Sequence, residues 1–159
     1  MKDNIRIGTR GSKLALYQAE LVKSHIAGHL PMVQVDIIII KTSGDMIRKR
    51  AVNPFETKRV FTREIEDALL SEKVDVAVHS AKDLAAILPE GLKIGAVLVR
   101  EDPRDCLITA DNKKLAELPL GARVGTSSLR RKMQLLRLSG ELNVQEMRGN
   151  VDSRIRKLF

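Results

Sequence analysis

The stretch at residues 33–41, VQVDIIIIK, constrains the fold of this 159-residue chain more than any other. Its four consecutive isoleucines predict a strand that is buried on both faces, as in a parallel sheet flanked by helices. A short strand at residues 5–8 and an amphipathic helix at residues 13–28 precede it. This order predicts a right-handed βαβ unit and therefore an α/β fold.

The alternation of strands and helices continues along the chain. We expect helices at 61–72, at 128–139 and from 150 to the end, a partly helical stretch at 111–118, and strands at 74–78, 93–99, 105–109, 123–125 and 142–147. The charged, proline-containing stretch at 100–104, REDPR, interrupts the pattern and predicts an interdomain hinge. We therefore expect domain 1 at residues 1–99 and the first part of domain 2 at residues 105–159.

The composition excludes several classes of protein. A hydrophobic content of 43% with 30% charged residues is typical of a soluble globular chain. No apolar run approaches the roughly 20 residues of a membrane span, and the N-terminus lacks the apolar core of a signal peptide. The single cysteine, Cys106, excludes an internal disulfide and favours a cytoplasmic location. With three histidines and no ligand spacing, we expect no metal site.

The net charge of +8 calls for an anionic partner. Nucleic acid is one candidate and would bind with a steep salt dependence. However, only 3% of the residues are aromatic, so the chain offers no stacking platform for single strands. The basic residues also cluster at loops and helix starts, which favours a pocket for a polyanionic small molecule over a nucleic-acid groove.

Two strands of the first domain end in polar residues that suit an anion site. Residues 8–12, GTRGS, join the first strand to the first helix and offer Arg10 and Ser12 beside a positive helix end. Ser12 can cap the helix and also contact a ligand. The strand at 74–78 runs into Ser80, Lys82 and Asp83, at the edge where open α/β sheets bind ligands. The alternative for this second stretch is an ordinary polar loop. The basic segment at 42–59 predicts a flexible flap near the ligand.

The second domain repeats this arrangement with arginines. Arg130 and Arg131 fall in the first turn of a predicted helix, where the helix dipole disfavours cations unless an anion offsets them. Arg148 follows a predicted strand, and Arg154 lies near the start of the last helix. We expect a two-lobed cleft that binds several carboxylates or phosphates, with Asp83 as the single acidic side chain among the cations. The alternative is that each arginine is a solvated surface charge.

Seven motifs, in this order, resemble the porphobilinogen deaminase (hydroxymethylbilane synthase) family: IRIGTRGSKLALYQAELV, KTSGD, FTREIEDALL, VDVAVHSAKDL, REDPRD, VGTSSLRRKMQLL and MRGNVDSRIRKL. The resemblance spans essentially the whole chain. It implies a two-lobed fold like the type II periplasmic binding proteins, with mixed or parallel sheets. It also implies a transferase of haem biosynthesis, which deaminates porphobilinogen and couples four units head to tail into hydroxymethylbilane. Each pyrrole carries an acetate and a propionate, which would explain the arginines.

The resemblance also implies a role for each matching residue. Asp83 would be the catalytic carboxylate, interacting with pyrrole N–H groups and the azafulvene cation. The residues that would bind substrate, polypyrrole chain and cofactor through charge or hydrogen bonds are Arg10, Ser12, Lys58, Ser80, Lys82, Thr126, Ser127, Ser128, Arg130, Arg131, Arg148 and Arg154.

The chain departs from the family in length and at three places. The family enzyme is about twice as long, and its third, α+β domain carries the cysteine that holds the dipyrromethane cofactor; Cys106 does not match that cysteine. Arg59 replaces a usual glycine in the flap, and Ala85 replaces a usual proline. We therefore expect an N-terminal portion, inactive alone, that works with a separate C-terminal fragment. The alternative function is a non-catalytic carboxylate-binding module on the same scaffold.

Overall fold

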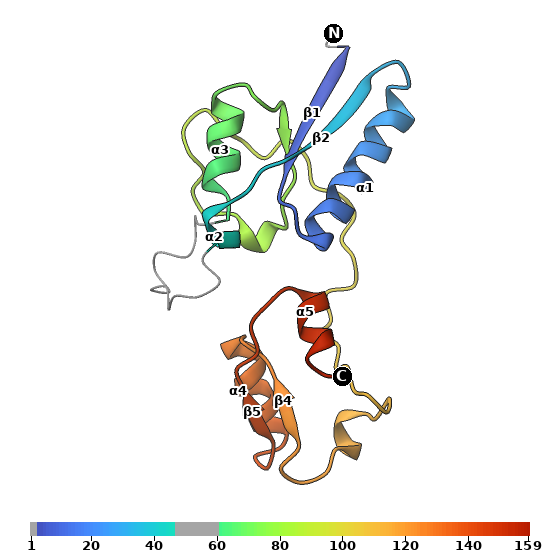
Figure 1. The fold of residues 1–159 in the computed structure, drawn as a ribbon, viewed down its shortest axis with the longest axis vertical. Coiled ribbons are helices and arrows are strands. Elements are labelled where there is room, and N and C mark those ends of the chain that lie inside the picture. Colours follow the sequence, from blue (N-terminus) through green and yellow to red (C-terminus); the bar gives the residue numbers. More distant parts are fainter. Residues whose placement is uncertain (1–2, 47–60) are drawn as a thin grey trace. The chain divides into compact units, whose positions relative to one another are not determined.

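The computed structural model describes residues 3–46 and 61–159. The chain divides into two compact units, Met1–Val97 and Leu98–Phe159, and each is described by itself (Figure 1). Both units combine helices with a parallel sheet, which confirms the predicted mixed α/β class. The predicted domain bounds and the hinge at residues 100–104 stay predictions.

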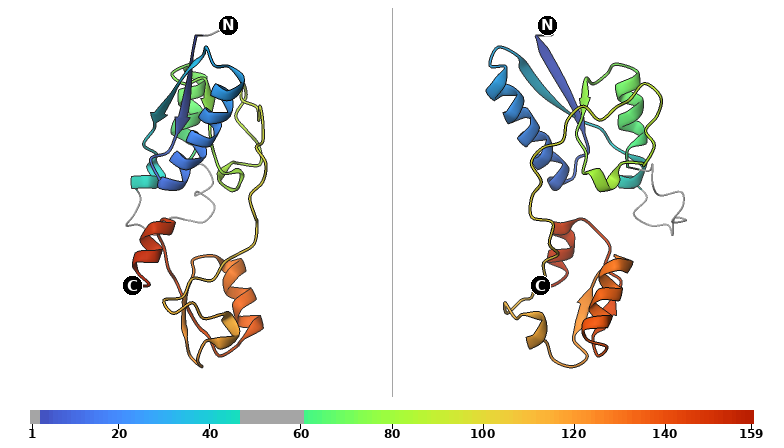
Figure 2. Two further views of the ribbon diagram at one scale, coloured as in Figure 1. Left: turned by 90° about the vertical axis from the view of Figure 1, so that its right-hand side faces the viewer. Right: turned by 180° about the vertical axis from the view of Figure 1, so that it is seen from behind.

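The first unit is built on a three-stranded parallel sheet in the order β2-β1-β3. Its elements are β1 (Asn4–Thr9), α1 (Lys13–His29), β2 (Gln34–Ile39), the short α2 (Ser43–Met46), α3 (Arg63–Leu70) and β3 (Val76–Ala77). Helices α1 and α3 lie on opposite faces of this sheet (Figures 1 and 2). The opening βαβ unit is therefore confirmed.

The core of this unit lies between α1 and the sheet. Ile7 of β1, Ala19 of α1 and Val35 of β2 are buried together, and Val22 and Ile26 extend the same face of α1. These helical residues are three or four positions apart, so they form one stripe along the helix. Strand β1 lies in the middle because β2 and β3 pair with it in parallel on either side, with Ile7 opposite both Ile37 and Val76.

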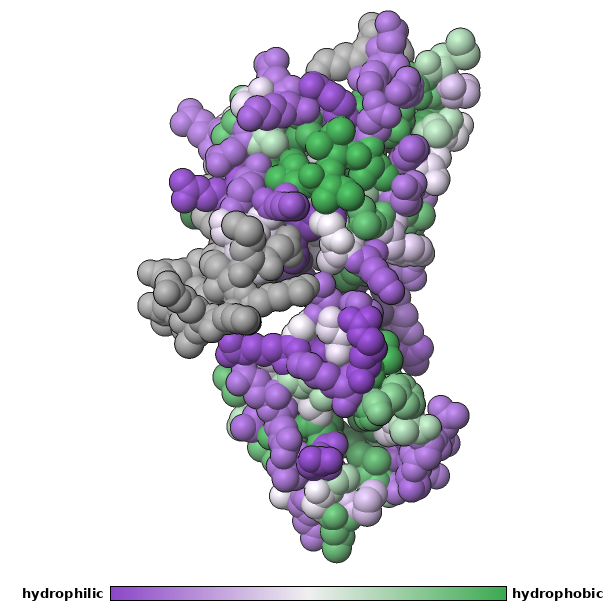
Figure 3. All heavy atoms as spheres, viewed as in Figure 1, coloured by the Kyte–Doolittle hydropathy of each residue, from purple (hydrophilic) through white to green (hydrophobic). Residues whose placement is uncertain are grey.

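One prediction about burial and one about strand length are wrong for this sheet. The isoleucine run of β2 is not buried on both faces, because Ile38 and Ile39 are 39% and 56% exposed. Strand β2 is an edge strand, so fewer neighbours cover its carboxyl end. Hydrophobic atoms gather on the visible face of this unit where β2 crosses it (Figure 3). Strand β3 is also shorter than predicted, and Val76 is exposed while Val74 is buried.

The strands predicted at residues 93–99 and 105–109 are also wrong. Both segments are described, and neither forms a helix or a strand. Their apolar residues face solvent, including Ile94, Val97, Val99 and Ile108. A β-branched sequence becomes a strand only where another strand supplies hydrogen-bond partners, and none pairs with these segments in the described parts of the chain.

The second unit is smaller and has little core. Its two-stranded parallel sheet joins β4 (Arg123–Gly125) to β5 (Asn143–Gln145). Helices α4 (Leu129–Leu138) and α5 (Val151–Arg156) follow these strands, and a one-turn 3₁₀ helix (Leu115–Glu117) precedes them. The helix at 128–139 is confirmed, although its apolar residues are not buried: Leu129 and Met133 are mostly exposed and Leu136 is half-buried.

Across residues 3–46 and 61–159, no helix combines the length and apolarity that crossing a membrane would require.

Candidate functional site

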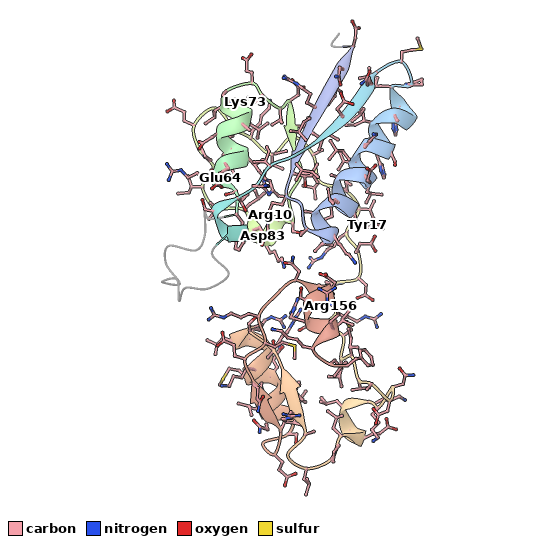
Figure 4. The ribbon with its side chains drawn as sticks, viewed as in Figure 1. Arg10, Tyr17, Glu64, Lys73, Asp83 and Arg156 are labelled. Carbon is pink, nitrogen blue, oxygen red and sulfur yellow. The ribbon has the colours of Figure 1, made fainter. Side chains whose placement is uncertain are left out.

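The carboxyl edge of the first unit's sheet collects several of the predicted site residues. Arg10 directly follows β1, and the segment from His79 to Asp83 follows β3. The two strands are parallel, with Gly8 opposite Ala77, so both segments leave the sheet at the same edge. Arg10 and Asp83 are drawn at this end of the unit in Figure 4. The edge thus presents a guanidinium and a carboxylate, as the sequence predicted.

Two serines at this edge already have structural partners. The hydroxyl of Ser12 accepts a hydrogen bond from the backbone N–H of Ala15 at 3.3 Å, so it caps α1. The hydroxyl of Ser80 donates to Oε1 of Gln18 on α1 at 3.0 Å. This second bond ties the segment after β3 to the helix after β1. Ser80 therefore fixes the position of the turn that carries Asp83.

Asp83 ends a one-turn 3₁₀ helix (Ala81–Asp83). Its backbone N–H donates to the carbonyl of Ser80 at 2.9 Å, which holds the turn closed. Asp83 is half-buried, whereas the neighbouring Lys82 is exposed. A half-buried carboxylate keeps one side accessible to a ligand while the protein restricts its motion.

Arg10 stacks on an aromatic ring. Its guanidinium carbon lies 4.3 Å from the centroid of the Phe61 ring, within the range of a cation–π contact. The same ring lies against Gly44 of α2, where a Cβ atom would lie only 2.3 Å from the ring carbons. The ring therefore fits against Gly44 because that position has no side chain, and the ring supports the guanidinium.

His79 is an additional ionisable group at this edge. Burial lowers the pKa of its imidazole, and the nearby Arg10 cation lowers it further, whereas the carboxylates of Asp83 and Glu66 raise it. Burial is the largest effect, so His79 favours its neutral form. The prediction that Asp83 is the single acidic side chain among the cations is wrong, because the carboxylate of Asp105 contacts Arg130 and Arg131 in the second unit.

In the second unit, two hydroxyl side chains accept hydrogen bonds from backbone N–H groups around the start of α4. Thr126 is buried, and its hydroxyl accepts a hydrogen bond from the backbone N–H of Ser128 at 3.1 Å. The hydroxyl of Ser128 in turn accepts from the backbone N–H of Arg131 at 3.4 Å, which makes it the N-cap. Ser127 is exposed between them. The hydroxyls of Thr126 and Ser128 therefore fix the turn from which Arg130 and Arg131 project.

Arg130 and Arg131 share one internal carboxylate. The Nη2 of Arg130 lies 2.8 Å from Oδ2 of Asp105, and the Nη2 of Arg131 lies 2.9 Å from Oδ1. The Nε of Arg131 also donates to Oδ1 at 3.0 Å. These hydrogen bonds hold the pKa of Asp105 below its ordinary value. The anion that the sequence required at this helix start is thus present within the chain.

The two remaining arginines lie around α5. Arg148 pairs with Glu146, which again shows an acidic partner that the sequence analysis did not anticipate. Arg154 on α5 is half-buried, and its Nε has no hydrogen-bond partner among residues 3–46 and 61–159. A buried N–H of this kind favours an acceptor such as a carboxylate oxygen.

One predicted residue, Lys58, lies outside the described residues, as does most of the predicted flap at 42–59. Its described beginning, α2, is a short helix rather than a flexible loop. The described part of the chain holds no cluster of three or more histidine, cysteine or acidic residues suited to a metal ion.

Three residues of the candidate site were not predicted from the sequence: Phe61, His79 and Asp105. Phe61 and Asp105 reach it only through tertiary contacts, which no local spacing reveals. His79 lies within the VDVAVHSAKDL motif, and its position next to Ser80 could have indicated that it belongs to the site.

A comparison with protein families matches residues 5–159 to "Porphobilinogen deaminase, dipyromethane cofactor binding domain". Among curated proteins, the chain is 50% identical over 154 residues to a porphobilinogen deaminase of Syntrophobacter fumaroxidans, covering 97% of this chain and 50% of that protein. It is 53% identical over 152 residues to that of Nitratidesulfovibrio vulgaris, covering 96% and 48%. With that of Rickettsia bellii, it is 49% identical over 159 residues, covering 100% and 53%. The chain spans about half the length of these relatives.

Proposed function

This chain belongs to the porphobilinogen deaminase family, and we propose that it takes part in making hydroxymethylbilane from porphobilinogen. In this proposal it binds the carboxylates of porphobilinogen and of the growing polypyrrole, and Asp83 is its catalytic carboxylate. The observation that carries the proposal is the contact of Arg130 and Arg131 with the carboxylate of Asp105, because the substrate carries the same functional group.

The proposed reaction begins with loss of ammonia. The bond between the aminomethyl carbon and nitrogen breaks, both electrons leave with nitrogen, and a pyrrole-stabilised cation remains. The free α-carbon of a second pyrrole then attacks the methylene carbon, forms the new carbon–carbon bond and loses its proton. A carboxylate beside the pyrrole N–H lowers the energy of the cationic state. Asp83 suits this role because the turn at residues 81–83 and the Ser80–Gln18 bond hold it in place.

The basic and hydroxyl residues would bind the acetate and propionate groups. In the first unit these are Arg10, Ser12, Ser80 and Lys82, and we keep Lys58 as part of the proposal. In the second unit they are Thr126, Ser127, Ser128, Arg130, Arg131, Arg148 and Arg154. Guanidinium groups suit this task because two of their N–H groups can bind both oxygens of one carboxylate.

The dipyrromethane cofactor carries the same acidic groups, so the same residues are suited to it. The contact of Asp105 with Arg130 and Arg131 supports this, because its carboxylate accepts hydrogen bonds from both guanidinium groups, as a cofactor carboxylate would. Arg130, Arg131 and Arg154 would hold the cofactor in the second unit. When bound, the cofactor supplies an electron-rich pyrrole carbon. Cys106, although exposed, does not match the family's attachment cysteine.

The finer architecture belongs to the same proposal. We propose the two-lobed arrangement of type II periplasmic binding proteins, with domain 1 at residues 1–99, a hinge at 100–104 and the first part of domain 2 at 105–159. We also propose that a polypeptide corresponding to the C-terminal half of the relatives completes the activity, in the cytoplasm. Support comes from the 48–53% of each relative's length that this chain covers.

The second candidate function is a non-catalytic module that binds carboxylates. It is favoured by the contact of Arg130 and Arg131 with Asp105, in which a carboxylate is bound and no bond is broken. The two candidates differ only in whether ammonia is released from porphobilinogen.

Ammonia release therefore tests the proposal. The chain is incubated with porphobilinogen, alone and together with a C-terminal half prepared from a relative, and ammonia and intact mass are measured. We expect ammonia release in the mixture, and a fall of at least about 100-fold for Asp83→Asn, the range of a lost electrostatic stabiliser. The control is Asp67→Asn, which removes an exposed carboxylate on α3. Binding without ammonia release in every mixture would leave only the carboxylate-binding module.

A further inference from the structure

Asp105 accepts hydrogen bonds from the guanidinium N–H groups that a ligand carboxylate would also use. Arg131 directs both Nε and Nη2 to Oδ1 of Asp105, at 3.0 and 2.9 Å. Arg130 directs Nη2 to the same carboxylate, and its Nη1 donates to Gln134 at 2.8 Å. The paired N–H groups of Arg131 are the ones that bind a carboxylate best. The N–H groups of Arg131 that would bind an external carboxylate best are therefore already hydrogen-bonded to Asp105.

The contact between Asp105 and the two arginines is nevertheless accessible to solvent, so a ligand can replace Asp105 in it. The side chain of Asp105 is 35% exposed, and those of Arg130 and Arg131 are 59% and 43% exposed. Ion pairs at such exposure contribute little net stability, because water and salt compete with both partners. The described residues 98–108 around Asp105 form no helix or strand, so no ladder of backbone hydrogen bonds fixes its position.

We infer that Asp105 is an internal carboxylate that ligand carboxylates must displace, and that it thereby sets which anions the Arg130–Arg131 pair can bind. A tethered partner acts at an effective concentration in the millimolar range. A weak monocarboxylate at lower concentration cannot compete with it. A ligand with several carboxylates can, because its other groups add binding energy.

This inference rests on the proposed function in one respect, namely that Arg130 and Arg131 bind ligand carboxylates. It makes Asp105 a specificity-determining residue rather than a catalytic one, since Asp105 holds the arginines and not the reacting atoms. Asp105 also gives the adjacent arginines a defined arrangement without ligand, because its carboxylate offsets two cations at the start of α4.

The test uses the complete 159-residue chain and propionate, which is followed by NMR titration at neutral pH. Asp105→Asn keeps the size of the side chain and removes its charge. We expect it to bind propionate about 3- to 10-fold more tightly, as release of two partly exposed ion pairs allows. Porphobilinogen binding should tighten by a similar factor, because both ligands displace the same group.

The matched control is Asp102→Asn, three positions earlier in the same stretch. In the described part of the chain, Asp102 pairs with Arg104 and makes no hydrogen bond or ion pair with Arg130 or Arg131. Asp102→Asn therefore removes the same charge without opening the Arg130–Arg131 pair. We expect no tightening for this variant. Equal tightening in both variants would overturn the inference, since the effect would then be one of net charge.

A second measurement needs no change at Asp105. In the unmodified chain, saturation with propionate should move the carboxyl-carbon signal of Asp105 to its value in the Arg130→Gln/Arg131→Gln double variant, where no guanidinium holds it. An Asp105 signal that stays in place while propionate binds would overturn the inference, as would a lack of propionate binding to both the unmodified chain and Asp105→Asn. Failure of the proposed function appears separately, as absence of ammonia release with the exchange intact.

Discussion

The guanidinium of Arg10 rests on the ring of Phe61, with 4.3 Å between the guanidinium carbon and the ring centroid. This contact joins the loop after β1 to the residues just before α3. It gives Arg10 a support other than a carboxylate. Stacking on an aromatic face fixes the plane of the guanidinium, and so orients the N–H edges that bind a planar anion.

Replacing Phe61 with leucine should therefore weaken carboxylate binding. We expect Phe61→Leu to raise the dissociation constant for porphobilinogen about 2- to 5-fold, the range of a partly exposed cation–π contact. Isothermal titration calorimetry measures the change. Phe159→Leu is the control, because Phe159 is exposed and distant in sequence from this contact. Equal affinities for the Phe61→Leu and Phe159→Leu variants would mean that the ring does not support Arg10 in binding.

Gly44 provides a test of the same contact through packing. A Cβ atom at this position would lie 2.3 Å from the Phe61 ring, so Gly44→Ala must displace the ring or α2. We expect a loss of about 1–3 kcal/mol in the free energy of unfolding, as for other overpacked sites. Gly28→Ala on α1 is the control, because nothing lies within 4 Å of its added methyl group. That control should be neutral or gain up to about 1 kcal/mol in the free energy of urea unfolding; a Gly44→Ala chain as stable as Gly28→Ala would contradict the packing argument.

The sequence predicted best those features that depend on neighbours along the chain. The β1–α1–β2 order, the Ser12 and Ser128 caps and the strand Arg123–Gly125 all follow from local patterns. Burial was harder to predict, because it depends on what covers a segment. Four isoleucines predict an apolar environment, but Ile39 lies on an edge strand and stays half exposed.

The same distinction applies to the candidate site. That an anionic ligand binds Arg130 and Arg131 stays a prediction. Their adjacency at a helix start indicated that some anion offsets them, and the structure places a carboxylate there. Its identity could not be predicted, since Asp105 reaches the arginines across more than twenty residues of intervening chain. The support of Arg10 by Phe61 is likewise a tertiary contact.

His79 should make the stability of the chain depend on pH. Its pKa is lowered in the folded protein, mainly by burial, below its ordinary value of about 6.5. The unfolded chain then binds more protons just below about pH 6.5, so the free energy of unfolding falls as the pH drops through that region. We expect His79→Gln to flatten this fall, as measured by urea unfolding at about pH 5.5 and about pH 7.5 on either side of the ordinary pKa.

The control for this prediction is His25→Gln, which removes an exposed histidine of α1. The groups that act on His79 are Arg10, Glu66 and Asp83, and all three are retained in both variants. A pH dependence that His79→Gln and His25→Gln flatten equally would assign it to the histidines in general rather than to the buried one.

The exposed apolar segment at residues 94–99 should cause the chain to associate with itself. Val97 and Val99 are 84% and 95% exposed, and the segment has no strand partner in the described parts of the chain. Unpaired apolar backbone of this kind favours edge-to-edge contacts between copies. We expect sedimentation equilibrium to give an average mass that rises above the monomer mass with concentration. The double variant Val97→Lys/Val99→Lys should remain monomeric, because adjacent like charges oppose pairing.

The control is Met32→Lys, at a similarly exposed position before β2, which should associate like the unmodified chain. If this variant also becomes monomeric, the added charge rather than the loss of the apolar segment is the cause.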